Sequence, residues 1–377
     1  MTMIDLDIRK RLGDFALDVS FSIPGHGVTA LFGRSGAGKT SVIAAIAGLL
    51  RPDEGHIRVA GRTLFDARVG ADVPIHRRRV GYVFQDGRLF PHLSVRDNLL
   101  YGYRRSPLRN RRITMEEVVA LLGVAPLLER RPRDLSGGEK QRVAIGRALL
   151  AQPEVLLMDE PFASLDAPRK REILPYLERL RDELRLPIVY VSHAIEEVVR
   201  LANQVVVLDA GRVAATGTPE QLGERLDLRP LLGEFESGAI IDAQVTAFDS
   251  QFELSTLAFE GGVLRVPGRA GDLGALVRVR VRARDVSLAL EKPAAISVQN
   301  IFAGAVEEVF EDSGAYAELK LRVSGTRFLS RVTRESVSRL GLVLGAQVYL
   351  LVKSVSLDHE TVSTVPGRAN GGLRHGD

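Results

Sequence analysis

The stretch GRSGAGKT, Gly33 to Thr40, follows an apolar segment and precedes the helix-like segment KTSVIAAIAGLL. It fits the phosphate-binding loop G-x-x-x-x-G-K-[ST], whose glycines let backbone N–H groups and a helix N-terminus face a polyphosphate. Lys39 is expected to reach the β- and γ-phosphates, and the Thr40 hydroxyl to ligate magnesium. The stretch therefore predicts a strand, a loop and a helix around a bound nucleotide. The predicted contacts are Gly33, Arg34, Ser35, Gly36, Ala37, Gly38, Lys39 and Thr40.

Two adjacent carboxylates end the apolar segment VLLMDEP. Asp159 is expected to join the magnesium ligands, and Glu160 to act as general base or to polarise the attacking water. The alternative is a solvated strand end, which is uncommon directly after a four-residue apolar run. The pair therefore predicts hydrolysis of the bound nucleotide.

The order of the other elements indicates an α/β fold. Strand-like segments such as EVLLMDEP and LPIVYVSH alternate with helices, which predicts a parallel sheet covered on both faces. A helical insert is expected at about 86–150, where Thr114 and Glu117 open ITMEEVVALLGV as a capping box.

From Ala239 onward the chain is strand-like, and it looks repeated. GALVRVRVRARDVSL (Gly274–Leu288) resembles GAQVYLLVKSVSL (Gly345–Leu357), which predicts two small β-barrel units. Valines alternate with arginines over 277–282, a pattern typical of a half-exposed strand.

Composition narrows the class of protein. The net charge of +4 is small against 51 basic and 47 acidic residues, so no nucleic-acid partner is implied. Arginine clusters at Tyr103–Arg112 and Glu129–Asp134 fit a solvated face or, alternatively, contact with anionic lipid headgroups. The longest apolar runs fall far below the roughly 18 residues that span a bilayer. With no cysteine and no recognisable export signal, the chain is expected in the cytoplasm.

The octet LSGGEKQR, Leu135 to Arg142, is the most specific motif. Ser136 and Glu139 alone could be an ordinary capping box. The whole octet, however, resembles the signature of ATP-binding-cassette (ABC) ATPases, and the resemblance covers about the first 230 residues. It implies a P-loop NTPase cassette with a helical subdomain, ATP and Mg²⁺ as cofactors, and ATP hydrolysis.

The resemblance also implies roles for residues outside the phosphate loop. Gln85 in YVFQD matches the loop glutamine, which contacts magnesium or water, and His193 in VSHA matches the switch histidine, which binds the γ-phosphate. In this family the signature of one cassette closes over the ATP of another, so a homodimer is implied. The remaining implied ATP contacts are Ser136, Gly137, Gly138, Asp166 and, as the adenine-stacking aromatic, Phe15.

Within the family, the chain looks most like the molybdate importers, on the segments GYVFQDGRLFPHLSVRDNLLYG, ARDVSLAL, ISVQNIFAGAV and VLGAQVYLLVKSVSL. This resemblance implies two copies of a membrane permease subunit, a periplasmic oxyanion-binding protein, and a peripheral location on the cytoplasmic face of the inner membrane. Import of another substrate, such as sulfate, tungstate, a polyamine, iron or a sugar, is the alternative. Soluble cassettes of DNA repair or translation, and molybdate-storage or sensor proteins, are less consistent with the motifs.

The tail resembles the molybdate-binding barrel called Mop, within an all-β region of OB-like units. By that resemblance Ser297, Thr333, Lys353 and Ser354 match anion-binding positions, whereas Gln299 stands where the barrel usually has arginine. Because a cation is lost, a purely structural tail barrel remains the alternative. The expected domains are an ATPase at 1–233, a first β unit at 234–291, a Mop domain at 292–360 and a disordered end at 361–377.

Overall fold

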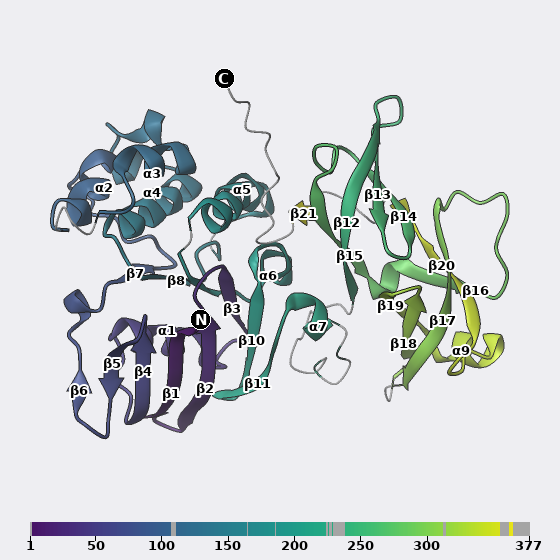
Figure 1. The fold of residues 1–377 in the computed structure, drawn as a ribbon, viewed down its shortest axis with the longest axis horizontal. Coiled ribbons are helices and arrows are strands. Elements are labelled where there is room, and N and C mark those ends of the chain that lie inside the picture. The colour runs from purple at the N-terminus through teal and green to yellow at the C-terminus, as the bar shows by residue number, and fades with distance from the viewer. Residues whose placement is uncertain are drawn as a thin grey trace. The chain divides into compact units, whose positions relative to one another are not determined.

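The computed structural model describes residues 2–106, 111–163, 165–184, 186–223, 225, 228, 238–311, 314–354 and 362–364 (Figure 1). The chain divides into two compact units, Met1–Thr216 and Gly217–Asp377.

The first unit is built on a sheet of eleven strands, counted over the described residues, in the order β6-β5-β4-β1-β2-β11-β10-β3-β9-β8-β7. Strands β10, β3, β9, β8 and β7 pair in parallel, as predicted, whereas β1, β2, β4, β5 and β6 pair antiparallel. The antiparallel half begins with β1 and β2, whose Leu12 and Phe15 pair across a two-residue turn too short for a parallel crossover. The strands are β1 (Thr2–Leu12), β2 (Phe15–Pro24), β3 (Val28–Phe32), β4 (Glu54–Val59), β5 (Arg62–Asp66), β6 (Ala71–Asp72), β7 (Val80–Val83), β8 (Val155–Asp159), β9 (Ile188–Val191), β10 (Gln204–Asp209) and β11 (Arg212–Gly217).

The helices of the first unit pack into two hydrophobic cores. Helix α1 packs with β1, β2 and β3, whereas α2 to α5 pack against the other core with β8 and β9. Helix α3 begins at the predicted capping box, in which Thr114 Oγ1 accepts from the N–H of Glu117 and Glu117 accepts from the N–H of Thr114. The helices are α1 (Lys39–Ala47), α2 (Val95–Tyr103), α3 (Met115–Leu122), α4 (Gly137–Leu150), α5 (Ala167–Glu183) and α6 (Ile195–Leu201). None of the helices within the described ranges is long and apolar enough to cross a bilayer.

The second unit contains two five-stranded sheets in its described part, β14-β13-β12-β15-β21 and β16-β20-β17-β18-β19. One hydrophobic core includes buried residues from both sheets, with Phe259, Phe302 and Phe328 in mutual ring contact. The elements are α7 (Pro219–Gly223), β12 (Gly238–Asp249), β13 (Leu254–Phe259), β14 (Gly262–Pro267), β15 (Leu276–Arg282), β16 (Val286–Ala289), β17 (Asn300–Glu311), β18 (Tyr316–Val323), β19 (Thr326–Thr333), α9 (Arg334–Leu340), β20 (Gln347–Val352) and β21 (Val362–Thr364).

The two sheets confirm the repeat predicted from the sequence. Gly274 and Gly345 both have φ of 85°, and each donates its N–H to a carbonyl of a long strand, that of Val245 in β12 and that of Val306 in β17. Both long strands also change register directly after that valine. Strands β12 to β15 therefore correspond to β17 to β20.

The repeats exchange their last strands. Strand β16 follows β15 in the chain but pairs with β20, and β21 follows β20 but pairs with β15. Each sheet is therefore completed by the strand that belongs to the other repeat. Since the hydrogen bonds of both sheets and the shared core depend on both repeats, we infer that the two fold together.

The structure differs from four expectations about this region. The compact units divide between Thr216 and Gly217, before α7, whereas the expected boundary is 233. Within the second unit, Glu220 of α7 forms an ion pair with Arg278 of β15. Strand β16 belongs to the second sheet although it lies within 234–291, and β21 falls within 361–377, a segment expected to be disordered. Strand β15 is not half-exposed, because Arg278 and Arg280 are only 6% and 4% exposed.

Candidate functional site

The predicted chemistry of the first unit collects at one edge of the sheet. Strands β3, β9, β8 and β7 are parallel neighbours, so their carboxyl ends lie at the same edge. Glu160, His193 and Gln85 follow β8, β9 and β7 within two residues of the strand ends, and the phosphate loop follows β3. This edge is where parallel α/β sheets bind ligands.

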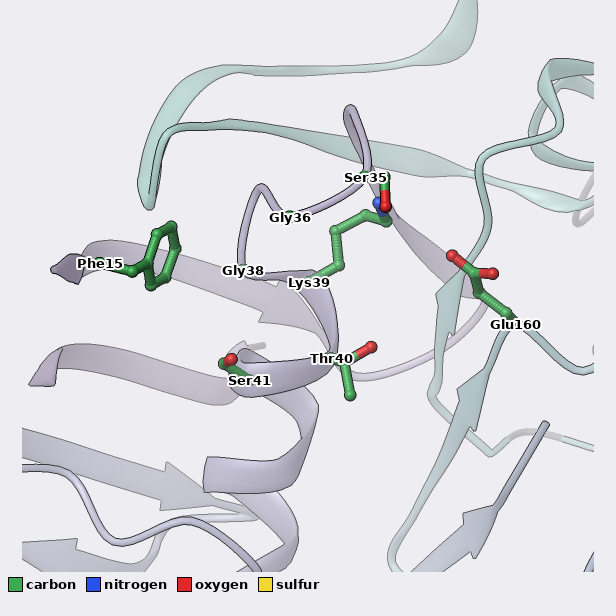
Figure 2. Close-up of a pocket in the computed structure, with 8 residues that line it drawn as sticks. All are labelled: Phe15, Ser35, Gly36, Gly38, Lys39, Thr40, Ser41 and Glu160. Carbon is green, nitrogen blue, oxygen red and sulfur yellow. The ribbon is translucent and has the colours of Figure 1, made fainter. Parts of the chain in front are cut away.

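A pocket of ≈ 230 Å³ opens over the phosphate loop, and it is lined by Phe15, Ser35, Gly36, Gly38, Lys39, Thr40, Ser41 and Glu160 (Figure 2). Lys39 is 5% exposed, and its Nζ donates to the carbonyls of Gly33 and Arg34 at 2.8 and 3.0 Å. Burial lowers the pKa of Lys39, while the nearby Glu160 and Asp159 oppose that shift. The loop thus places the ammonium group of Lys39 in the lining of the pocket.

Two glycines of the loop are required by its backbone path. Gly33 has φ of 149°, and a Cβ there would overlap the carbonyl oxygen of Leu208. Gly38 has φ of 100°, and a Cβ there would lie 2.8 Å from a methyl of Leu17 and 3.1 Å from the ring of Phe15. Phe15 therefore lies beside the loop and lines the same pocket, and its stacking on adenine stays a prediction.

Thr40 and Asp159 form a site suited to a hard cation. The Thr40 hydroxyl donates to Asp159 Oδ1 at 2.9 Å, and the Tyr82 hydroxyl donates to Asp159 Oδ2 at 3.1 Å. Burial raises the pKa of Asp159, whereas these two hydrogen bonds lower it. A hydroxyl and one carboxylate fit Mg²⁺, which is usually bound by one or two carboxylates with substrate phosphates and water. Tyr82 was not predicted, although YVFQ places it in the strand that precedes Gln85.

Glu160 and His193 lie together at the strand ends. His193 Nδ1 is 3.3 Å from Glu160 Oε2, and the N–H of Glu160 donates to the carbonyl of Val191 at 3.1 Å. Glu160 has φ of 43°, a left-handed conformation that costs a non-glycine residue free energy and is often found at functional sites. Glu160 also lines the pocket over the phosphate loop, so this left-handed residue lies at the candidate site.

The signature residues begin a helix and do not line the pocket formed by the described residues of the same chain. Ser136 caps α4 and Glu139 completes the capping box; the N–H of Ser136 is the main cause of a lowered pKa at Glu139. Ser136 and Gly137 are exposed, whereas Gly138 is buried and a Cβ there would lie 2.9 Å from Ile173 Cδ1. The exposed end of α4 is thus free of side chains at its first two positions.

Gln85 and Asp166 also lie outside that pocket lining. Gln85 is exposed in the turn after β7. Asp166 caps α5 and accepts from the N–H of Arg169 at 3.0 Å. Asp166 therefore has a structural role at the start of α5, whatever its contact with a nucleotide.

The tail candidates are more scattered. Ser297, Gln299 and Lys353 are exposed, and Ser354 accepts a hydrogen bond of 3.2 Å from the buried Asn300. Thr333 caps α9 through the N–H of Ser336 at 3.1 Å. The described contacts therefore link Ser354 to the strand that follows Gln299, while Thr333 is held by its own helix.

Comparison with known proteins agrees with this geometry. Residues 16–163 match the family model for ABC transporters, and residues 296–358 match that for the TOBE domain. A molybdenum import ATP-binding protein of Mesorhizobium japonicum is 52% identical over 94% of this chain and 96% of its own length. The chain belongs to the ABC transporter family. A second molybdenum import ATP-binding protein, from Paramagnetospirillum magneticum, is 50% identical over 96% of this chain and its full length.

A solved ABC structure resembles the cassette. CbiO1 of Clostridium perfringens, described as part of the ABC transporter complex CbiONQ, has a TM-score of 0.52 and 29% identity, and the match covers 60% of this chain and 95% of that chain. The match supports the cassette fold, and the TOBE model matches residues 296–358 of the β-rich tail. The ABC chain therefore binds ATP and hydrolyses it.

Proposed function

We propose that this ABC chain is the ATP-hydrolysing subunit of an importer that drives molybdate uptake. The observation that carries the proposal is the pocket that brings Lys39, Thr40 and Glu160 together, in a chain about half identical over nearly its whole length to molybdenum import ATP-binding proteins. These residues supply a cation for the phosphates, a hydroxyl for a metal and a carboxylate for water.

In this proposal the nucleotide binds along the phosphate loop with its base beside Phe15. Lys39 exchanges its bonds to the carbonyls of Gly33 and Arg34 for the β- and γ-phosphates. Thr40 and Asp159 would hold Mg²⁺, with Gln85 as a further contact from the β7 turn. When bound, Mg²⁺ neutralises charge that develops on the phosphates.

The hydrolytic step rests on Glu160 and His193. Glu160 orients the attacking water and accepts its proton as the bond between the β- and γ-phosphoryl groups breaks. His193, close to Glu160, donates a hydrogen bond to the γ-phosphate, and the leaving group is ADP. The left-handed backbone at Glu160 holds the carboxylate over the pocket.

The signature implies a second copy of the chain. Ser136, Gly137 and Gly138 open α4 where backbone N–H groups and the helix dipole favour a phosphate. Because the pocket is lined without them, we propose that they close over the ATP of a partner cassette in a homodimer, with Asp166 at the same interface. Two integral membrane permease subunits and, indirectly, a periplasmic oxyanion-binding protein would complete the importer, with this chain peripheral on the cytoplasmic face of the inner membrane.

The tail is proposed to bind molybdate near Ser297, Gln299, Lys353 and Ser354, with Thr333 as a further candidate. Hydroxyls, backbone N–H groups and one lysine suit an oxyanion. A second candidate is import of a related oxyanion such as sulfate or tungstate, because these tetrahedral dianions carry the same charge as molybdate and the same kinds of group would bind them.

The test is transport by the assembled importer. The chain, co-purified with its permease in vesicles and supplied with the binding protein, should show ATP hydrolysis stimulated by molybdate and accumulation of molybdate. Sulfate and tungstate are the comparison substrates. Stimulation by sulfate alone would overturn the molybdate assignment but keep the importer, and no ATP hydrolysis in any mixture would overturn both.

A further inference from the structure

A buried carboxylate contacts β9 and the residue that precedes His193. The proposed hydrolysis does not use it. Glu197 of α6 is 5% exposed. Its Oε2 accepts from the Tyr190 hydroxyl at 2.6 Å and from Ser192 Oγ at 2.7 Å, and its Oε1 lies 2.9 Å from Lys170 Nζ. One side chain thus connects β9, the segment after β9 and α5.

The contacts of Glu197 compensate for the burial of its charge. A buried carboxylate is tolerated when it is paired and hydrogen-bonded, because otherwise it loses its hydration without compensation. Lys170 supplies the opposite charge. Burial is the main cause of a pKa at Tyr190 well above its usual value, so the phenol keeps its proton and donates it in the hydrogen bond.

Ser192 links this hydrogen-bond network to the backbone next to His193. Ser192 Oγ donates to Glu197 and accepts from the N–H of Ala194 at 3.0 Å. The same hydroxyl therefore restrains the backbone on both sides of His193. The exposed ring of His193 then lies with Nδ1 at 3.3 Å from Glu160.

Lys170 connects the same carboxylate to the start of α5. The N–H of Lys170 donates to the carbonyl of Asp166 at 3.0 Å, and Asp166 caps that helix. The helix start and the His193 segment are thus held by opposite oxygens of a single carboxylate.

We propose that Glu197 is a positioning residue for hydrolysis: with Ser192 it fixes the orientation of His193, and with Lys170 it couples that orientation to the start of α5 at Asp166. The inference rests on the proposed role of His193. Its consequence is specific, since Glu197 is not among the residues that line the pocket and would act through its contacts with Ser192 and Lys170.

The experiment compares Glu197→Gln with Glu196→Gln in the full chain. The control removes the same charge from the neighbouring exposed position of α6. Glu197→Gln should lower kcat by about tenfold, as expected for a misplaced catalytic group, while the ATP dissociation constant and KM stay within about twofold of the parent. The control should leave kcat, KM and binding unchanged. Equal kcat in both variants would overturn the proposal.

Two further variants keep the result decisive if circular dichroism shows that Glu197→Gln does not fold. Ser192→Ala leaves the Lys170–Glu197 pair in place. It removes only the two hydrogen bonds of the Ser192 hydroxyl, to Glu197 and to the N–H of Ala194, so kcat should fall with ATP binding intact. Lys170→Met should act in the same direction through α5. A parental kcat in a folded Ser192→Ala chain would overturn the proposal.

A cycle with His193→Ala separates this inference from the proposed function. If Glu197 acts through His193, adding Glu197→Gln to His193→Ala should change kcat by less than about twofold, although each single variant is impaired. Additive losses would overturn the positioning role. Unchanged turnover in His193→Ala alone would instead overturn the proposed role of His193, independently of the Glu197 result.

Discussion

The two units of the molecule place their polar residues in opposite ways. In the first unit, short loops after parallel strands bring Lys39, Glu160 and His193 from distant parts of the chain to one edge of a sheet. In the second unit, antiparallel strands that exchange between two repeats build a shared core, and the anion candidates are exposed, or occupied in caps and cross-strand bonds. The parallel sheet of the first unit thus brings its candidate residues together at one site, whereas the repeat of the second unit leaves its candidate residues apart.

The largest expected effect tests the first unit. Glu160→Gln should lower steady-state ATP hydrolysis by about 10²- to 10⁴-fold, the range for loss of a general base. ATP affinity should remain within about twofold by titration, because Lys39 and the loop are untouched. Glu183→Gln, a partner of Arg179 on α5, is the control with parental turnover. Persistent hydrolysis by Glu160→Gln would remove the carboxylate from the mechanism and weaken the contrast between the units.

An intermediate effect tests the core of the second unit. Asn300 is 1% exposed; its Oδ1 accepts from the N–H of Arg265 at 2.7 Å, and its Nδ2 donates to the Arg265 carbonyl at 3.1 Å, joining β17 to β14. Asn300→Leu should lower the free energy of unfolding by about 1–3 kcal/mol, because it leaves buried polar groups unpaired. Chemical denaturation measures the loss.

Its neighbour provides the control for Asn300. Gln299→Leu alters an exposed side chain and should change the unfolding free energy by less than about 0.5 kcal/mol. Both variants should retain parental ATP affinity. If Asn300→Leu were as stable as Gln299→Leu, the cross-strand bonds would not contribute to the repeat.

The smallest effect tests whether the tail senses an anion. Lys353→Ala should weaken the response of ATPase activity to molybdate by about two- to fivefold in half-maximal concentration, the scale of an exposed charge interaction. Gln299→Arg restores the cation and should shift it in the opposite direction. The assembled importer, titrated with molybdate, reports both. Identical curves for the two variants would leave the tail as scaffold and sharpen the contrast with the first unit.

Much of the first unit could be predicted because its motifs are local. The phosphate loop and the two capping boxes at Thr114 and Ser136 depend on residues within a few positions of one another, and all are present in the structure. The antiparallel half of the sheet and the Tyr82 hydroxyl on Asp159 were not predicted. They depend on which strands become neighbours, and strand order is a property of the whole sheet.

The tail was predicted less completely, for the same reason. Its internal repeat was visible at Gly274 and Gly345, where a positive φ favours glycine in both copies. The alternation of valine and arginine over 277–282 indicated a half-exposed strand, yet Arg278 is buried and forms ion pairs with Glu220 and Asp242. Periodicity reports which side chains share a face, and only the packed neighbours decide whether that face meets water.

The sequence by itself determined the cassette chemistry and the repeat, because both are written in short segments whose backbone geometry requires particular residues. Only the tertiary structure decided the strand exchange of the tail, the approach of His193 to Glu160 and the three contacts of Glu197. These features join residues that are adjacent through sheet order and burial. Backbone hydrogen bonds and a shared hydrophobic core hold the exchanged strands, and buried polar pairs hold Glu197; no local sequence pattern places these groups together.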